Sequence, residues 1–255
     1  MYNQIHSERT KDAITHGNKF IAGYVLAGYK DEIQFFETLK ICEDYNVDVL
    51  EIGFPSQHPY ADGEIISNAH KAVDFKKATS VDYWKEIREK TDKPIWLMAY
   101  YNDFIKTNIY KEFAKAQVID AIVIPDASNE IKLQLQEELK EANIDIIGFA
   151  NPEMNKEELS YVLSHFAIVY EQLYVGQTGV EQKETLYHDM LNYTLKNYPH
   201  VICFGGFGLN TPQKIKEVLN DGFFGAVIGT EIIKKVNIST KELASFLKEI
   251  NEVKK

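Results

Sequence analysis

Eight short apolar runs recur along the 255-residue chain, and segments with helical spacing of their apolar residues separate them. Because parallel strands need crossovers of helix length, this alternation predicts a parallel sheet covered by helices. Eight such units in about 250 residues are typical of an α/β fold of the (β/α)8 TIM barrel type, so we expect a single barrel domain over residues 1–255. The predicted strands cover residues 20–27, 49–52, 94–101, 121–126, 144–149, 166–170, 201–204 and 224–228.

The segment before the first strand predicts an extra N-terminal helix. Residues 3–16 carry Ile5, Ala13 and Ile14 among polar residues, as expected of a short helix that covers one end of the barrel. An open doubly wound sheet is the alternative fold. A dinucleotide-binding sheet would carry Gly-x-Gly-x-x-Gly after its first strand, and this chain lacks that motif there, which favours the barrel.

Charge and composition argue against several functional classes. The formal net charge is −10, the pI is near 5.3, and no basic cluster offers a site for nucleic acid or anionic lipid. No run of 18 apolar residues and no signal-like N-terminus are present, so we expect a cytoplasmic protein that does not bind membranes. Cys42 and Cys203 are predicted buried free thiols, and the seven histidines lack metal-ligand spacing, so no metal is expected.

The second apolar run carries an acid where a buried strand rarely has one. Glu51 lies between Leu50 and Ile52, although strands covered on both faces are almost continuously apolar. Asp62 follows in an Ala-Asp-Gly loop. Two carboxyls in different environments can hold different protonation states at one pH, so the pair is predicted to perform acid/base chemistry. The alternative is that Glu51 pairs with a Lys or Arg, and Asp62 only caps a helix beginning near Gly63.

Other unusual residues lie at the predicted strand ends. The active site of a barrel lies at the carboxyl ends of its strands, where loops of different length meet. These strand ends therefore define the candidate site. The residues collected there are Glu51, Tyr100, Asn102, Asp126, Tyr170, Gly206, Gly208 and Gly229.

Glycines after the last two strands predict a phosphate site. Gly206 and Gly208 follow the seventh strand, and Gly229 with Thr230 follows the eighth and opens a short helical run. Barrels commonly bind phosphate at this position with backbone N–H groups and a helix N-terminus, and the Thr230 hydroxyl can donate as well. The alternative is that the glycines only make tight turns. Residues 176–179, with Thr178 between glycines, are predicted to form a lid over substrate.

The motifs at 50–55 (Leu-Glu-Ile-Gly-Phe-Pro) and 59–63 (Pro-Tyr-Ala-Asp-Gly) resemble the signature Leu-Glu-Leu-Gly-x-Pro-Phe-Ser-Asp-Pro-x-Ala-Asp-Gly-Pro of the tryptophan synthase alpha chain family. The spacing of the two acids is kept, and the likeness covers nearly the whole chain. Further motifs occur in the family's order at 100–102, 124–126, 178–179, 206–208 and 228–230.

The resemblance implies a lyase of tryptophan biosynthesis that cleaves indole-3-glycerol phosphate to indole and glyceraldehyde 3-phosphate. It implies that Glu51 is the general acid/base that protonates the indole carbon, that Asp62 binds the indole N–H, and that Tyr170 lies beside the substrate. The implied contacts to substrate come from Tyr24, Tyr100, Thr178, Gly179, Gly206, Phe207, Gly208, Gly229 and Thr230. No cofactor is expected on this chain, because pyridoxal phosphate belongs to a β-chain partner in an expected α2β2 heterotetramer.

Three departures from the family pattern stand out. Residues 56–58 are Ser-Gln-His where the family has Phe-Ser-Asp, Glu64 replaces a proline, and the arginine usual before residues 178–179 is missing. The first of these segments faces the β chain in the family. Two alternatives therefore stay open: a barrel enzyme acting on another small phosphorylated substrate, and a catalytically silent subunit that activates a partner.

Overall fold

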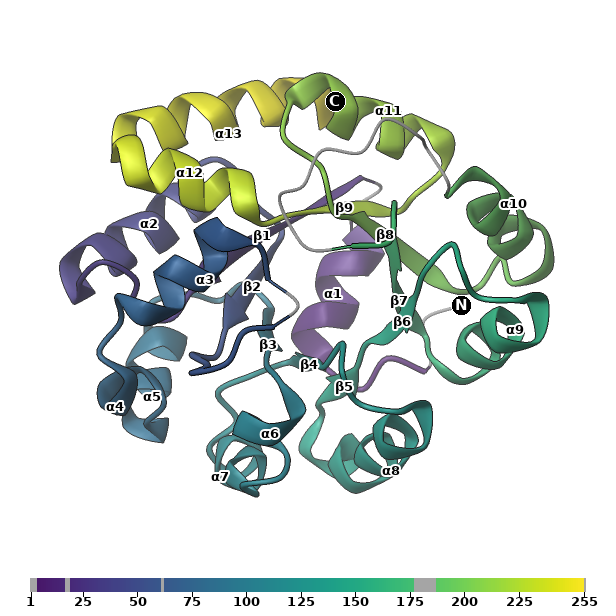
Figure 1. Cartoon of the computed structure of the whole chain (residues 1–255), viewed down its shortest axis with the longest axis horizontal. Coiled ribbons are helices and arrows are strands. Elements are labelled where there is room, and N and C mark those ends of the chain that lie inside the picture. The colour runs from purple at the N-terminus through teal and green to yellow at the C-terminus, as the bar shows by residue number, and fades with distance from the viewer. Residues whose placement is uncertain (1–3, 17–18, 61, 177–186, 255) are drawn as a thin grey trace.

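The computed structural model of the chain describes residues 4–16, 19–60, 62–176 and 187–254 (Figure 1). All strand pairs are parallel, and the strands run in the order β5-β4-β3-β2-β1-β9-β8-β7-β6. The predicted barrel is confirmed. The strands are β1 Phe20–Leu26, β2 Val49–Gly53, β3 Ile95–Met98, β4 Ala121–Val123, β5 Asp145–Ile146, β6 Gly148–Ala150, β7 Ile168–Gln172, β8 Ile202–Gly206 and β9 Gly225–Ile228.

The strand predicted at 144–149 differs from expectation, because it is divided into β5 and β6. β5 pairs with β4, whereas β6 pairs with β7. Between them, the Ile147 N–H donates to the Ile122 carbonyl at 3.0 Å. One continuous segment therefore bonds to both neighbours in turn and closes the barrel, so nine short strands fill the eight strand positions of the predicted fold.

The helices surround the strands, and α1 lies across one end of the barrel as predicted (Figure 1). Among the described helices, none is long and apolar enough to cross a bilayer. Short helices α4 and α6 were not predicted. The helices are α1 Glu8–His16, α2 Glu32–Asp44, α3 Glu64–Lys71, α4 Phe75–Ala78, α5 Val81–Glu89, α6 Tyr101–Phe104, α7 Ile109–Ala116, α8 Asn129–Leu139, the 3-10 helix η1 Lys140–Ala142, α9 Lys156–His165, α10 His188–Asn197, α11 Pro212–Asp221, α12 Thr230–Ile238 and α13 Thr240–Lys254.

The third and fourth strands end earlier than predicted, each for its own reason. Pro125 has no N–H to continue a ladder, and the chain turns there after β4. The carboxylate of Asp126 then accepts the Tyr101 N–H at 2.9 and 3.0 Å, at the first residue of α6. An anion at a helix N-terminus is stabilising, so Asp126 fixes the α6 start and ends the strand before residue 101.

The apolar residues form two layers because strand side chains alternate between the faces of the sheet. Inside the barrel, Val49, Trp96, Ile168 and Phe204 pack with Ile14 of α1. Outside it, residues of the alternate register pack against the helices in a second, larger cluster that contains Cys42 and Cys203 as buried free thiols. The N-terminal helix thus belongs to the inner core.

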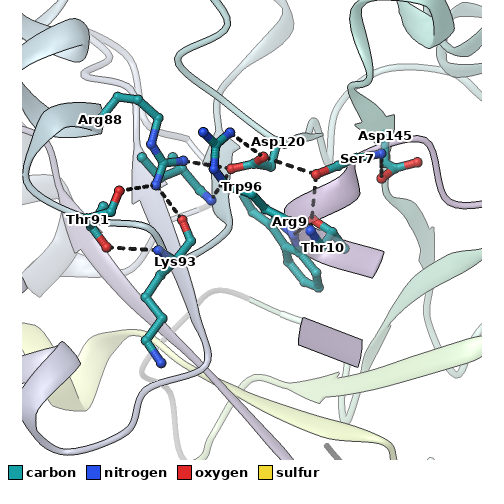
Figure 2. A network of polar contacts seen from close by, with 10 residues as sticks. Ser7, Arg9, Thr10, Arg88, Thr91, Lys93, Trp96, Asp120 and Asp145 are labelled. Carbon is teal, nitrogen blue, oxygen red and sulfur yellow. Dashed lines mark hydrogen bonds and ion pairs between the residues drawn. The ribbon is translucent and has the colours of Figure 1, made fainter. Parts of the chain in front are cut away.

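The end of the barrel covered by α1 holds a network of compensated charges (Figure 2). Asp120 accepts the Ser7 hydroxyl at 3.0 Å and Arg9 at 3.4 Å on one oxygen. Its other oxygen accepts Arg88 and the Ile95 N–H, both at 2.8 Å. Four donors from three segments therefore surround this buried carboxylate and tie the start of α1, α5 and β3 together.

Candidate active site

Glu51 lies inside the barrel near the carboxyl ends of the strands. It is 4% exposed and stands in register with Tyr24 of β1 and Trp96 of β3. No Lys or Arg pairs with it in the part of the chain that the structure describes. Burial, with a smaller contribution from the neighbouring charge of Asp62, raises the pKa of Glu51 to about 8, so the carboxyl is protonated at neutral pH. The described residues therefore offer no support for the ion-pair alternative, and within them Glu51 is an uncompensated acid.

Asp62 lies in the connection between β2 and α3 and is 7% exposed. Tyr100 donates its hydroxyl to Asp62 Oδ2 at 2.7 Å. The N-cap of α3 is Gly63, so Asp62 lies one residue before the cap position, and its carboxylate is engaged with Tyr100. The carboxyl of Asp62 is instead close enough to Glu51 to raise the pKa of that residue. The predicted pair of acids and Tyr100 therefore come together.

His70 also belongs to this group, although it was not among the predicted site residues. Its side chain is 1% exposed, and its Nε2 lies 3.6 Å from Asp62 Oδ2. Its Nδ1 accepts the Ser56 N–H at 2.9 Å. A signal was present, since Ile66, Ala69 and His70 follow the i, i+3, i+4 spacing of the buried face of α3.

Two tyrosines complete the inner wall of the site. Burial raises the pKa of Tyr24 and Tyr170 well above the ordinary value, and the charges of Glu51 and Asp62 add to this effect at both hydroxyls. Both rings therefore face the acids as neutral phenols. The Tyr24 hydroxyl is buried and has no hydrogen-bond partner among the described residues. An orphaned hydroxyl of this kind is suited to meeting a ligand.

Gly206 has a structural role in addition to any contact with a ligand. It ends β8, and a Cβ at this position would overlap the hydroxyl of Tyr170. Gly53 is related to Tyr24 in the same way. These two glycines thus make room for the two tyrosines. The sequence alone indicates only a tight turn or a phosphate contact for Gly206.

An aromatic wall extends from Tyr170 toward the predicted phosphate loop. Tyr170 stacks on Phe149 with ring centroids 5.2 Å apart, and Phe207 meets Tyr170 edge-on at 5.9 Å. Phe207 has φ +76°, a left-handed conformation that is strained for a bulky residue, and Gly208 follows with φ +75°. Such strain at a site is consistent with a ring held in place for a ligand.

The predicted phosphate loops lie next to each other. β8 and β9 are paired, with Gly206 opposite Val227, so the turn at Phe207 and Gly208 adjoins the one at Gly229. Gly229 is the N-cap of α12 and forms no side-chain cap hydrogen bond, and Thr230 is the first helical residue. The first N–H groups of a helix lack intrahelical partners and attract anions. Thr178 and Gly179 lie outside the described residues.

Lys132 is a second unforeseen residue at this end of the barrel. It is 3% exposed, and its Nζ lies 5.8 Å from the centroid of Phe149. Burial lowers the pKa of Lys132 to about 8, although Asp126 opposes the effect. The sequence did contain a signal for the burial of Lys132, because it lies three and seven residues before Leu135 and Leu139 on one face of α8. Among the described residues, no group of His, Cys, Asp and Glu is arranged to hold a metal.

Comparison with known proteins identifies one family that matches nearly the whole chain. The family model of the tryptophan synthase alpha chain matches residues 11–255. The tryptophan synthase alpha chain of Caldicellulosiruptor saccharolyticus is 31% identical over 245 residues, which cover 93% of this chain and 94% of that one. The alpha chain of Petrotoga mobilis is 29% identical over 249 residues, with 93% and 94% covered.

Solved structures share the fold. Mycobacterium tuberculosis tryptophan synthase superposes with a TM-score of 0.83 at 16% identity, covering 97% of this chain and 98% of that one. A chain from the Pyrococcus furiosus tryptophan synthase α2β2 complex gives a TM-score of 0.78 at 25% identity, covering 91% and 97%. The match over nearly the full length, together with a buried acid pair at the strand ends, leads to one conclusion: the chain belongs to the tryptophan synthase alpha chain family.

Proposed function

We propose that Glu51 and Asp62 carry the family reaction in this chain, the cleavage of indole-3-glycerol phosphate to indole and glyceraldehyde 3-phosphate. The observation that supports this assignment is the buried Glu51 carboxyl, which has no paired cation among the described residues and lies next to a second carboxyl held by Tyr100. A protonated acid and a nearby carboxylate are the two groups that this lyase reaction needs.

The proposed mechanism begins with proton transfer. Glu51 is protonated at neutral pH and donates its proton to the indole ring carbon that bears the glycerol chain. The ring becomes a cation, and Asp62 stabilises the charge by accepting the ring N–H. The Glu51 carboxylate then takes the proton of the adjacent glycerol hydroxyl. The carbon–carbon bond breaks, its electron pair restores the indole ring, and the hydroxyl carbon leaves as the aldehyde.

The aromatic residues provide the proposed indole pocket. Tyr24, Tyr100, Tyr170 and Phe207 come from β1, the start of α6, β7 and the turn after β8, and they lie around or beside the two acids. Neutral tyrosines next to carboxyls add no charge and keep water out, which favours protonation of the ring over that of solvent.

The substrate phosphate is proposed to bind at the other side of the pocket. Backbone N–H groups of Gly206, Phe207 and Gly208 and the N-terminus of α12 at Gly229 and Thr230 would hold it. Thr178 and Gly179 are assigned to substrate binding on the family resemblance alone. Attachment of the phosphate at this position would direct the glycerol chain toward Glu51.

A tryptophan synthase β chain is the expected partner, and we propose an α2β2 assembly. The family requires no cofactor on the α chain, since pyridoxal phosphate is bound by the β chain. Residues 55–60 are called the 55–60 segment below. His58 and Tyr60 of this segment are exposed, Tyr60 to 57%. This segment is the proposed contact with the β chain. A cytoplasmic location is proposed because the family takes part in amino-acid biosynthesis.

The test is indole release from indole-3-glycerol phosphate by the purified chain, alone and with a β chain. We expect release that rises when the β chain is added. Equal release with and without it would remove the partnership and leave a free-standing lyase. A folded chain that releases no indole in either case would overturn the proposed function and favour another phosphorylated substrate or a silent subunit.

A further inference from the structure

We propose that His70 is a positioning residue that links the 55–60 segment to the carboxylate of Asp62. The inference rests on the proposed function, because it assigns a task to His70 in the same reaction. His70 does not touch the proposed substrate position. It acts through Asp62, and the contacts of its two ring nitrogens describe how.

The hydrogen bond at Nδ1 fixes the tautomer of the ring. The Ser56 N–H donates to His70 Nδ1 at 2.9 Å, and both residues are buried. A backbone N–H is only a donor, so Nδ1 presents its lone pair and the neutral imidazole carries its proton on Nε2. The ring is thereby a donor on the side that faces Asp62.

The Nε2–H group points to the catalytic end of the barrel. Nε2 lies 3.6 Å from Asp62 Oδ2, slightly beyond hydrogen-bonding distance, and has no hydrogen-bond acceptor in the described ranges. The same oxygen accepts the Tyr100 hydroxyl at 2.7 Å. Catalytic hydrogen bonds are often long in a free enzyme and tighten when substrate binds. A small shift of Asp62 toward α3 would satisfy the orphaned donor and hold the carboxylate between two donors.

The other side of the ring is connected to an exposed part of the chain. Ser56 accepts the His58 N–H on its hydroxyl at 3.0 Å, and His58 itself is exposed. Ser67, one turn before His70 on α3, donates its hydroxyl to the Asp62 carbonyl at 3.1 Å. A partner that moves the 55–60 segment therefore moves the Ser56 N–H, and the imidazole conveys this displacement to Asp62.

Three substitutions separate the two contacts of the ring. His70→Gln keeps an amide N–H near the position of Nε2 but removes the acceptor at Nδ1. His70→Asn keeps an acceptor near Nδ1 but has no donor that reaches Asp62, and His70→Phe removes both while keeping a ring. His165→Gln, at an exposed histidine at the end of α9, is the matched control.

The measurement is kcat and KM for indole release, with and without a β chain, for each variant whose circular dichroism matches the unsubstituted chain. We expect kcat to fall about tenfold to a hundredfold for His70→Phe and His70→Asn, with KM changed less than about threefold, because a misplaced catalytic group lowers turnover. His70→Gln should keep most of the kcat of the isolated chain but lose its response to the β chain.

Two failures can be told apart. If the unsubstituted chain releases no indole, the proposed function is overturned and this inference falls with it. If it releases indole, and His70→Phe and His70→Asn do so with the same kcat, only the role of His70 is overturned. A parallel loss of kcat in all three variants, without rescue by His70→Gln, would indicate a packing role and would also overturn the proposal.

Discussion

The two ends of the barrel treat buried carboxyls in opposite ways. At the end covered by α1, Asp120 accepts four hydrogen bonds, two of them from Arg9 and Arg88 (Figure 2). At the opposite end, Glu51 is equally buried and has no cation beside it in the described chain. Burying an acid costs free energy unless donors compensate it. The first acid therefore stabilises the fold, whereas the second lowers stability, as expected if it has the proposed catalytic role.

The largest expected effect is the loss of catalysis when the uncompensated acid is made neutral. Glu51→Gln should lower indole release about a thousandfold, since a positioned general acid contributes roughly 10²–10⁴-fold, while the circular dichroism spectrum stays unchanged. Glu171→Gln is the matched control. Glu171 is buried on β7, four strands away from β2 in the sheet order, its pKa is also raised by burial, and it faces Thr194 and Cys203 in the outer layer. Near-normal turnover of Glu51→Gln would contradict the assignment.

At the α1 end the same kind of change should affect stability. Asp120→Ala leaves Arg88 without its buried partner, and breaking a buried pair in this way costs about 3–5 kcal/mol in free energy of unfolding. Urea unfolding measures the loss. The value of kcat under native conditions should stay close to that of the unsubstituted chain. A loss of less than about 1 kcal/mol in the free energy of unfolding would mean that the Asp120–Arg88 pair contributes no more than an exposed ion pair. It would weaken the contrast between the two ends of the barrel.

The pH dependence of stability sharpens the comparison. Since the pKa of Glu51 is raised from 4.5 to about 8 on folding, its contribution to stability is fully present below pH 4.5 and is lost as pH rises through 8. Glu51→Gln does not ionise. It should match the unsubstituted chain near pH 4.5 and exceed it at pH 9 by on the order of 5 kcal/mol. Thermal or urea unfolding of both chains from pH 4.5 to about pH 9 gives the difference in stability. A difference that does not change with pH would contradict the raised pKa of Glu51.

The smallest expected effect concerns the buried cation at the catalytic end. The pKa of Lys132 falls from 10.5 to about 8 on folding, so the charged amine costs stability below pH 8, and the cost disappears as pH approaches 10.5. Lys132→Met should raise the free energy of unfolding by about 1 kcal/mol at pH 7 and by less at pH 10. Lys115→Met on the exposed side of α7 is a suitable control. Destabilisation at pH 7 would indicate that the amine has a favourable partner.

The sequence predicted the architecture because apolar periodicity is a local property. It could not predict the division at Ile147, which depends on how one segment meets β4 and β7 in turn. Asp126 had been grouped with the site residues because of its place at a strand end. Its carboxylate instead accepts the Tyr101 N–H, a contact between residues 25 apart in the chain.

The candidate site was predictable to the extent that its chemistry is unusual in sequence. An acid inside an apolar run identified Glu51, and a family motif identified Asp62. His70 and Lys132 were missed because polar residues on amphipathic helices are usually exposed. Only the register of α3 and α8 against the barrel brings these two side chains inward. Residue type alone does not carry this information.

The pairing of β1 with β9 has a consequence for how the chain is made. Phe20 lies opposite Gly225, so during synthesis β1 has one open edge until about 200 further residues have left the ribosome. An open strand edge can pair with another chain. Barrel closure is therefore a late step of biosynthesis, and slow elongation through α11 would prolong the period in which the nascent chain is prone to aggregate or needs a chaperone.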